Sequence, residues 1–156
     1  VQELVFLGGP DGALDATPKI VKELREAIER IRPKIIYLPT MLDTHHDHWA
    51  ANRVFYRCIA EMDHPPDPTI LCREYEVWSP LRANRLACLN GVADLKRQAL
   101  EQFTTQIERF DLVHVVLGLN GYRSMYPFKG VGYAEAFYES SLPNYCQLYE
   151  RFESKR

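Results

Sequence analysis

Three histidines and two aspartates fall within the six residues Asp43-Thr44-His45-His46-Asp47-His48. The whole chain has five histidines, so more than half of them lie in this one segment. Neutral imidazole nitrogens and carboxylate oxygens are ligands of zinc, and both groups transfer protons near neutral pH. The segment therefore predicts a metal site or an acid–base site.

The spacing within this histidine segment (residues 43–48) predicts different roles for its members. If a helix begins near His46, then His45 and His48 lie about one turn apart and can face one cavity. Asp47 is then placed to orient a neighbouring imidazole, and His46 points away toward solvent. The alternative is a polar helix N-terminus without a ligand, where the helix dipole favours Asp47.

A strand, a helix and a second strand are predicted ahead of the histidine segment. Residues 1–7, from Val1 to Leu7, predict a strand, and a turn with glycine and proline follows at 8–12. Thr17 and Pro18 predict a helix start, and apolar residues recur at helical spacing as far as Pro33. Residues 34–39 predict a strand covered on both faces. This right-handed βαβ unit implies a parallel sheet, with ligands bound at the carboxyl ends of its strands.

The rest of the chain predicts further elements. We expect helices over residues 50–62 and 92–110, strands over 69–77 and 86–89, and a proline loop over 64–68. Residues 113–117 fit a strand or a helix equally well. The glycines, prolines and aromatic residues over 118–144 predict an ordered surface loop that borders a site.

Length, charge and cysteine usage exclude several classes of protein. A length of 156 residues predicts a single domain over residues 1–156. The net charge of -2 argues against a nucleic-acid partner, and no apolar run approaches the roughly 20 residues that span a membrane. Four isolated cysteines, without a C-x-x-C pair, predict buried apolar thiols in a reducing, cytoplasmic setting; they are Cys58, Cys72, Cys88 and Cys146.

The histidine segment, followed by Arg53, resembles the second signature of the PIG-L/LmbE-like N-acetylglucosaminyl deacetylases, which runs His-Pro-Asp-His and continues into a helix. Other similarities follow in the order of that family. Residues 7–14 are similar to its Leu-Gly-x-x-Asp turn, and residues 98–106 to its late helix ending near Ser-Gln. Residues 118–123 and 132–137 are similar to its carboxyl-terminal Glu-Ala-Phe region.

This resemblance implies a Rossmann-like α/β fold, with a mainly parallel sheet flanked by helices and one zinc ion. It implies hydrolysis of an N-acetyl group from a glucosamine-containing substrate, here a small-molecule amino-sugar conjugate. By this matching His48 is a zinc ligand, His45 stabilises the oxyanion as an imidazolium or protonates the leaving amine, and Asp47 orients His45. Asp11 matches a position that contacts the sugar.

Arg53 and Glu135 are further candidates for substrate contacts. Arg53 lies four residues beyond Trp49 on the predicted helix, so it can reach a substrate anion or form a salt bridge. The carboxylate of Glu135 suits sugar hydroxyls. The aromatic residues around it also fit core filling or the interface of a homo-oligomer.

The sequence departs from the family pattern at its amino terminus. The family's first signature, His-Pro-Asp-Asp-Glu after an opening strand, supplies two zinc ligands and the general base, and it is missing here. We therefore expect an amino-terminally incomplete LmbE-like domain that lacks its first βα unit. There are two alternatives: a non-catalytic sugar-binding or scaffold domain of the same fold, and a phosphoesterase.

Overall fold

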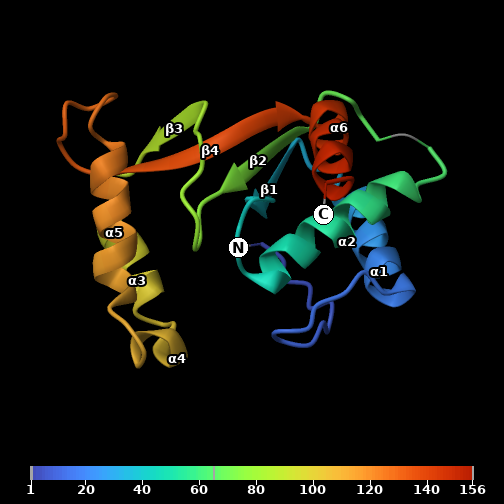
Figure 1. The fold of residues 1–156 in the computed structure, drawn as a ribbon, viewed down its shortest axis with the longest axis horizontal. Helices are drawn as coiled ribbons and strands as arrows, with labels where there is room; N and C mark the ends of the chain where they lie inside the picture. Colours follow the sequence, from blue (N-terminus) through green and yellow to red (C-terminus); the bar gives the residue numbers. More distant parts are fainter. Residues whose placement is uncertain (1, 65, 156) are drawn as a thin grey trace. The chain divides into compact units, whose positions relative to one another are not determined.

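The structure is a computed structural model that describes residues 2–64 and 66–155. Val1 of the predicted opening strand and Pro65 of the predicted loop lie outside the described residues. The elements follow the order α1 (Pro18–Ile31), β1 (Ile35–Pro39), α2 (His46–Ala60), β2 (Leu71–Tyr75), β3 (Arg85–Cys88), α3 (Ala93–Leu100), α4 (Thr104–Ile107), α5 (Leu112–Arg123), β4 (Ala134–Ser141) and α6 (Leu142–Glu153) (Figure 1). None of the helices in the described ranges has the length and apolar character that crossing a membrane requires.

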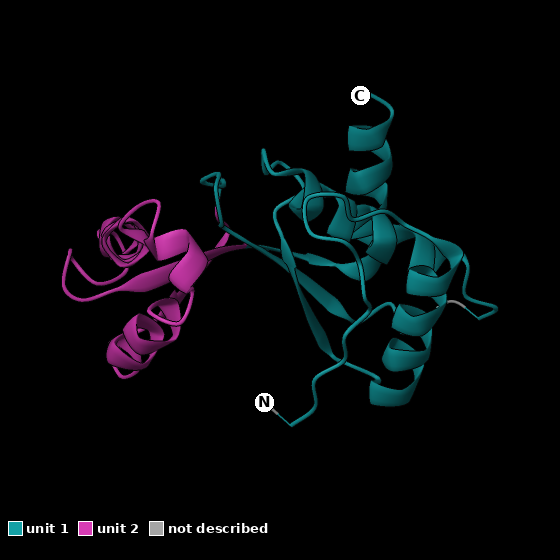
Figure 2. Ribbon diagram, turned by 90° about the horizontal axis from the view of Figure 1, so that it is seen from below, with its two compact units in different colours: residues 1–82, 138–156 teal, residues 83–137 magenta. Residues whose placement is uncertain are grey.

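The chain divides into two compact units (Figure 2). Unit 1 comprises residues 1–82 and 138–156, and unit 2 comprises residues 83–137. Strand β4 begins in unit 2 and ends in unit 1, where α6 follows it directly. The histidine segment belongs to unit 1. The expectation of one domain over residues 1–156 stays a prediction.

The four strands are hydrogen-bonded in the order β1-β2-β4-β3. In unit 1, β1 and β2 are parallel, with Ile35 opposite Leu71 and Pro39 opposite Tyr75, and α2 is the crossover between them. Strand β3 pairs with β4 in the antiparallel direction. The predicted α/β fold is confirmed, but the antiparallel pairing was not part of the predicted, mainly parallel sheet.

Helix α1 shows how closely local signals fix an element. The side chain of Thr17 accepts a hydrogen bond from the Ile20 N–H, as an N-cap residue should. Pro18 then occupies the first turn, where the missing N–H of proline costs nothing. Arg32 ends the helix in the left-handed conformation with φ of 50°, and Pro33 prevents its continuation.

Three predicted elements are wrong. Residues 2–10 form no strand, because an extended segment needs a neighbouring strand for its ladder; Leu4 and Phe6 remain exposed. The predicted helix over 92–110 is interrupted between α3 and α4. The predicted loop over 118–144 contains the end of α5, all of β4 and the start of α6.

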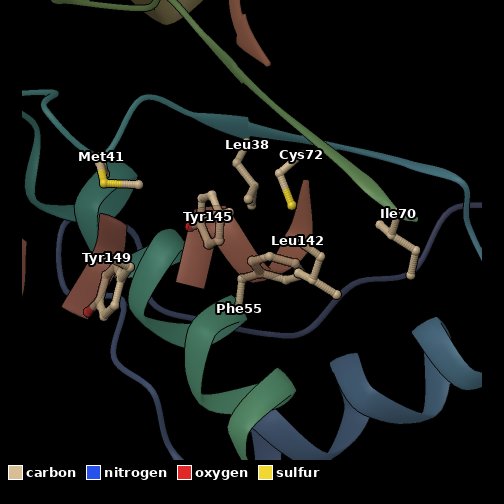
Figure 3. Close-up of a cluster of buried hydrophobic side chains, with 8 residues drawn as sticks. All are labelled: Leu38, Met41, Phe55, Ile70, Cys72, Leu142, Tyr145 and Tyr149. Carbon is tan, nitrogen blue, oxygen red and sulfur yellow. The ribbon is translucent and has the colours of Figure 1, made fainter. Parts of the chain in front are cut away.

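The main core of unit 1 lies between the parallel strands, α2 and α6 (Figure 3). Its buried members are Leu38, Met41, Phe55, Ile70, Cys72, Leu142, Tyr145 and Tyr149. The rings of Phe55 and Tyr145 meet edge to face, with centroids 5.3 Å apart. This core fixes α2 against the end of β1.

All four cysteines are free thiols. Cys58 and Cys72 are buried as predicted, and burial raises their pKa values to about 11 and about 12. Cys88 is exposed and Cys146 is half-buried, so the predicted burial is wrong for Cys88. It lies at the end of β3, outside the core of unit 1.

Candidate active site

The histidine segment lies where β1 ends and α2 begins, as predicted. Strand β1 ends at Pro39, and a turn closes when the Asp43 N–H donates to the Thr40 carbonyl over 3.0 Å. Helix α2 then starts at His46 with His45 as its N-cap residue. The polar side chains are thereby gathered at the carboxyl end of a parallel strand, where open α/β sheets bind ligands.

Asn52 connects the start of α2 to the end of β1. Its side-chain nitrogen donates to the Pro39 carbonyl over 2.9 Å and to the His48 carbonyl over 2.8 Å. Its oxygen accepts a hydrogen bond from the Tyr145 hydroxyl over 2.6 Å. Since Asn52 is completely buried, these bonds satisfy a polar group that would otherwise destabilise the core. Sequence analysis missed this role, although an asparagine on an otherwise apolar helix face was a usable signal.

Asp43 is the buried carboxylate of the site. One oxygen accepts the His45 N–H over 3.0 Å, and the other accepts the Trp78 N–H over 3.0 Å. Burial opposes ionisation of Asp43, but these two backbone bonds, with His48, outweigh it and lower its pKa. Asp43 is therefore an anion inside the protein, and it faces the imidazole of His48.

His48 lies beside this anion. Its Nδ1 is 3.4 Å from Oδ2 of Asp43, an ion-pair contact that is not aligned as a hydrogen bond. Nδ1 is buried and has no hydrogen-bond partner among the described residues. A carboxylate at Nδ1 favours a proton there, which leaves Nε2 with a free lone pair. The side chain is 23% exposed, so the ring is reachable from solvent.

The rings of His45 and His48 lie together, with centroids 4.7 Å apart and planes inclined by 35°. Nδ1 of His45 accepts the Asp47 N–H over 3.2 Å and so caps the helix. A ring nitrogen that accepts a hydrogen bond carries no proton, so this cap leaves Nε2 as the ring nitrogen that can donate. The imidazolium role expected of His45 stays a prediction.

The side chain of Asp47 holds a distant turn. Its two oxygens accept the Gly12 N–H over 2.6 Å and the Leu14 N–H over 3.0 Å, and Oδ1 lies 3.2 Å from Nδ1 of His46. The hydrogen bond from Leu14 is the main reason why the pKa of Asp47 is lowered. The Asp47 side chain thus binds residues 12–14, while its N–H bonds to the His45 ring; its role in orienting His45 stays a prediction.

Asp11 belongs to the turn that Asp47 holds. The turn is closed by the Ala13 N–H, which donates to the Pro10 carbonyl over 3.3 Å, and Gly12 adopts φ of 74°. A positive φ of this size is easily adopted by glycine. Asp47 thus ties the segment that carries Asp11 to the first turn of α2.

Arg53 and Glu135 occupy different parts of the chain. Arg53 lies 3.6 Å from the Asp15 carboxylate and stacks over the Trp49 ring at 5.6 Å, so it forms the predicted alternative, a salt bridge. Glu135 is on β4 within unit 2, where it pairs with Lys96. Within unit 1, Arg53 thus pairs with Asp15 rather than with Asp43.

The donor atoms of the site fit only part of a zinc site. His48, with a buried carboxylate behind it, has the arrangement of a metal-ligating histidine. A zinc site needs three or four protein ligands, and no group of three His, Cys, Asp or Glu residues in the described ranges could hold a metal ion. The described residues therefore supply one zinc ligand, His48, and the carboxylate of Asp43 beside it. They do not form a complete zinc site.

Comparison with known proteins supports the resemblance found in the sequence. Residues 1–59 match the PIG-L family. The matching family model is described as GlcNAc-PI de-N-acetylase, and the matched range includes the whole histidine segment. The predicted family resemblance is thus confirmed over this PIG-L range. No curated protein sequence matches the chain.

Solved structures extend the fold comparison beyond the PIG-L range. The conserved protein TT1542 from Thermus thermophilus is 26% identical, with a TM-score of 0.70 over 85% of this chain. GalB, the 4-carboxy-2-hydroxymuconate hydratase of Pseudomonas putida, is 17% identical with a TM-score of 0.68 over 83% of this chain. The N,N'-diacetylchitobiose deacetylase of Pyrococcus horikoshii is 17% identical with a TM-score of 0.61 over 84% of this chain.

This chain spans only part of each of these proteins. It covers 63% of TT1542, 61% of the hydratase and 54% of the deacetylase. The same fold is found in a hydratase and in a deacetylase, so the fold does not decide between reactions. The PIG-L match, which includes the histidine segment, is more specific.

Proposed function

We propose that this chain forms part of a zinc-dependent hydrolase that removes an N-acetyl group from a glucosamine-containing small molecule. The observation that carries the proposal is the pairing of the His45 and His48 rings, 4.7 Å apart, in front of the buried Asp43 carboxylate. The match of residues 1–59 to a de-N-acetylase family supports it.

His48 is the residue that would hold the metal. Asp43 keeps a proton on Nδ1 of His48 and leaves Nε2 as the ligand atom. Zinc bound there would supply Lewis-acid activation of water and of the acetyl carbonyl. The further ligands and the general base would come from outside the described residues.

His45 would act on the amide itself. With Nδ1 accepting the Asp47 N–H, its Nε2–H is available as a donor. A donor beside His48 is placed to stabilise the negative charge that develops on the carbonyl oxygen. Asp47 would contribute indirectly, because it holds the turn in which Asp11 is available for a sugar hydroxyl.

The proposal is tested by amine release from an N-acetylglucosamine conjugate, with zinc supplied. The assay compares this chain, and a version extended at its amino terminus, with variants at the histidine segment. We expect His45→Ala to lower kcat by about 10²–10³, the scale of one lost oxyanion donor. His46→Ala is the matched control, because His46 is exposed and does not share the ring contact of His45 and His48.

Two outcomes of this assay would contradict the proposal. Sugar binding without amine release in the extended protein would favour the non-catalytic alternative. Equal losses of activity in His45→Ala and His46→Ala would show that the position of His45 beside His48 does not contribute to catalysis.

A further inference from the structure

A cavity of about 260 Å³ lies within unit 1, apart from the histidine pair. Its walls are mainly apolar and come from the loop after β1, the segment after β2, and α6; they include Met41, Leu81, Leu148 and Phe152. Glu74 and Arg82 are the charged residues of its lining. His45, Asp47 and His48 do not line it, so the proposed function does not account for it.

Glu74 lines this cavity, and one of its two carboxyl oxygens forms no hydrogen bond with a described residue. The residue is only 4% exposed. Its Oε2 accepts the Met41 N–H over 2.8 Å and the Thr40 hydroxyl over 3.2 Å. Thr40 Oγ1 in turn accepts the Leu42 N–H over 3.3 Å, which directs its own proton to Glu74. Oε1 has no hydrogen-bond partner among the described residues. Oε1 is not one of the fully buried unpaired polar atoms of the described residues, so it keeps accessible surface and can bond to a ligand group.

We propose that this cavity binds a small carboxylate with an apolar body, whose oxygens accept hydrogen bonds from Glu74 Oε1 and from Arg82. The two hydrogen bonds to Oε2 place the acidic proton of the neutral side chain on Oε1, which makes it a donor toward the cavity. Burial raises the pKa of Glu74 more than its two hydrogen bonds lower it, so Glu74 stays protonated to a higher pH than a free glutamate does.

Arg82 selects the charge of the ligand. Its side chain is exposed and forms no ion pair or hydrogen bond with another described residue. A guanidinium at the lining attracts a carboxylate and repels an amine. When Glu74 is protonated, the lining favours an anion over a cation.

The volume sets the size of the ligand. A cavity of about 150 Å³ accommodates benzene, so a cavity of about 260 Å³ accommodates roughly eight to ten non-hydrogen atoms. Hexanoate has this size and carries an unbranched apolar body that can adapt to the leucine and methionine walls.

The test is calorimetric titration of the full chain with hexanoate, together with amide chemical-shift mapping. We expect hexanoate to shift the amides of Met41 and Leu148 and to leave those of His45 and His48 unchanged. 1-Hexanol and hexylamine, which have the same chain length, should bind at least about tenfold more weakly than hexanoate, because each loses the charged hydrogen bond to Arg82.

Variants distinguish binding through Arg82 and Glu74 from binding by apolar contacts alone. Arg82→Gln should weaken hexanoate about tenfold. Glu74→Gln should preserve binding, because its amide oxygen can accept from Thr40 and Met41 while its NH₂ group donates into the cavity. Arg151→Gln is the control: it removes a positive charge from α6 without touching the lining.

The proposal is overturned by any of four results: no hexanoate binding, equal binding of hexanoate and 1-hexanol, preference for hexylamine, or unchanged binding in Arg82→Gln. Hexanoate shifts confined to His45 and His48 would also overturn it. Loss of amine release in the hydrolase assay, with hexanoate binding intact, would contradict only the proposed function.

Discussion

The role of Asp43 depends on contacts that residue spacing does not reveal. The sequence predicted that His45 and His48 lie about one turn apart and face one cavity, and their rings lie 4.7 Å apart. It did not predict that Asp43 stands behind His48, because this requires the turn at Thr40 and the N–H of Trp78 from a distant loop. Helical periodicity reports positions within one helix and is silent about such tertiary partners.

Asp47 leads to a prediction about stability and pH. Its pKa is lowered in the folded protein, chiefly by the Leu14 N–H, so the ionised form stabilises the fold. This contribution is complete above the unfolded pKa of about 3.9 and disappears as the pH falls through the lower, folded pKa. We expect wild type to be more stable than Asp47→Asn near neutral pH, with the difference shrinking in acid.

Urea unfolding of both proteins between about pH 5 and pH 3 checks this prediction. Faster amide exchange at Gly12 and Leu14 in Asp47→Asn would locate the effect at the turn. A stability difference that does not vary across this pH range would contradict the role assigned to the Asp47 carboxylate.

At the scale of elements, periodicity and capping signals predicted α1, β1, α2 and β2 well. Local residues determine these elements, such as the Thr17 cap of α1 and the apolar run of β1. Strand β4 lacks such a signal, because its sequence AEAFYESS has few β-branched or alternating apolar residues. Its strand conformation is supported by pairing with its neighbours, which sequence pattern alone does not show.

Residues 113–117 illustrate a different ambiguity. Their apolar run fits a strand or a helix, and the structure forms α5. The side chain of Asp111 accepts the His114 N–H over 2.9 Å and caps the helix. The cap, rather than the apolar run, was the signal that favoured a helix.

The connection between β1, α2 and α6 predicts the effect of changing Asn52. Asn52→Ala removes three hydrogen bonds, of which two are buried and one is partly buried, so we expect a loss of about 2–4 kcal/mol in the free energy of unfolding. Tyr145→Phe removes only one of them, and we expect about 1–2 kcal/mol.

Urea denaturation of the two single variants and the double variant measures both values. Because the Tyr145–Asn52 bond is counted in each single variant, the double variant should lose less than their sum. Strict additivity, or a loss below about 0.5 kcal/mol in Asn52→Ala, would contradict the proposed connection.

At the scale of the whole molecule, the two units differ in how their helices are buried. Helix α2 of unit 1 has five buried residues, whereas α3 and α4 of unit 2 have none. Single-sequence patterns assigned both regions as amphipathic helices, because a pattern shows which face is apolar and not whether that face is covered.

This difference predicts local stability. We expect the amides of α3 and α4 to exchange with solvent at least about tenfold faster than those in the middle of α2, after correction for intrinsic rates. Hydrogen exchange followed by mass spectrometry or NMR measures it. Equal protection in α2 and α3 would contradict the account of burial.

The central claim is that His48, supported by Asp43 and beside His45, is a metal ligand. Zinc content by elemental analysis, on this chain and on a version extended at its amino terminus, tests it most directly. In the extended protein we expect His48→Ala to lose zinc, and His45→Ala and His46→Ala to retain it. Zinc retained in His48→Ala, or lost equally in His45→Ala, would contradict the claim.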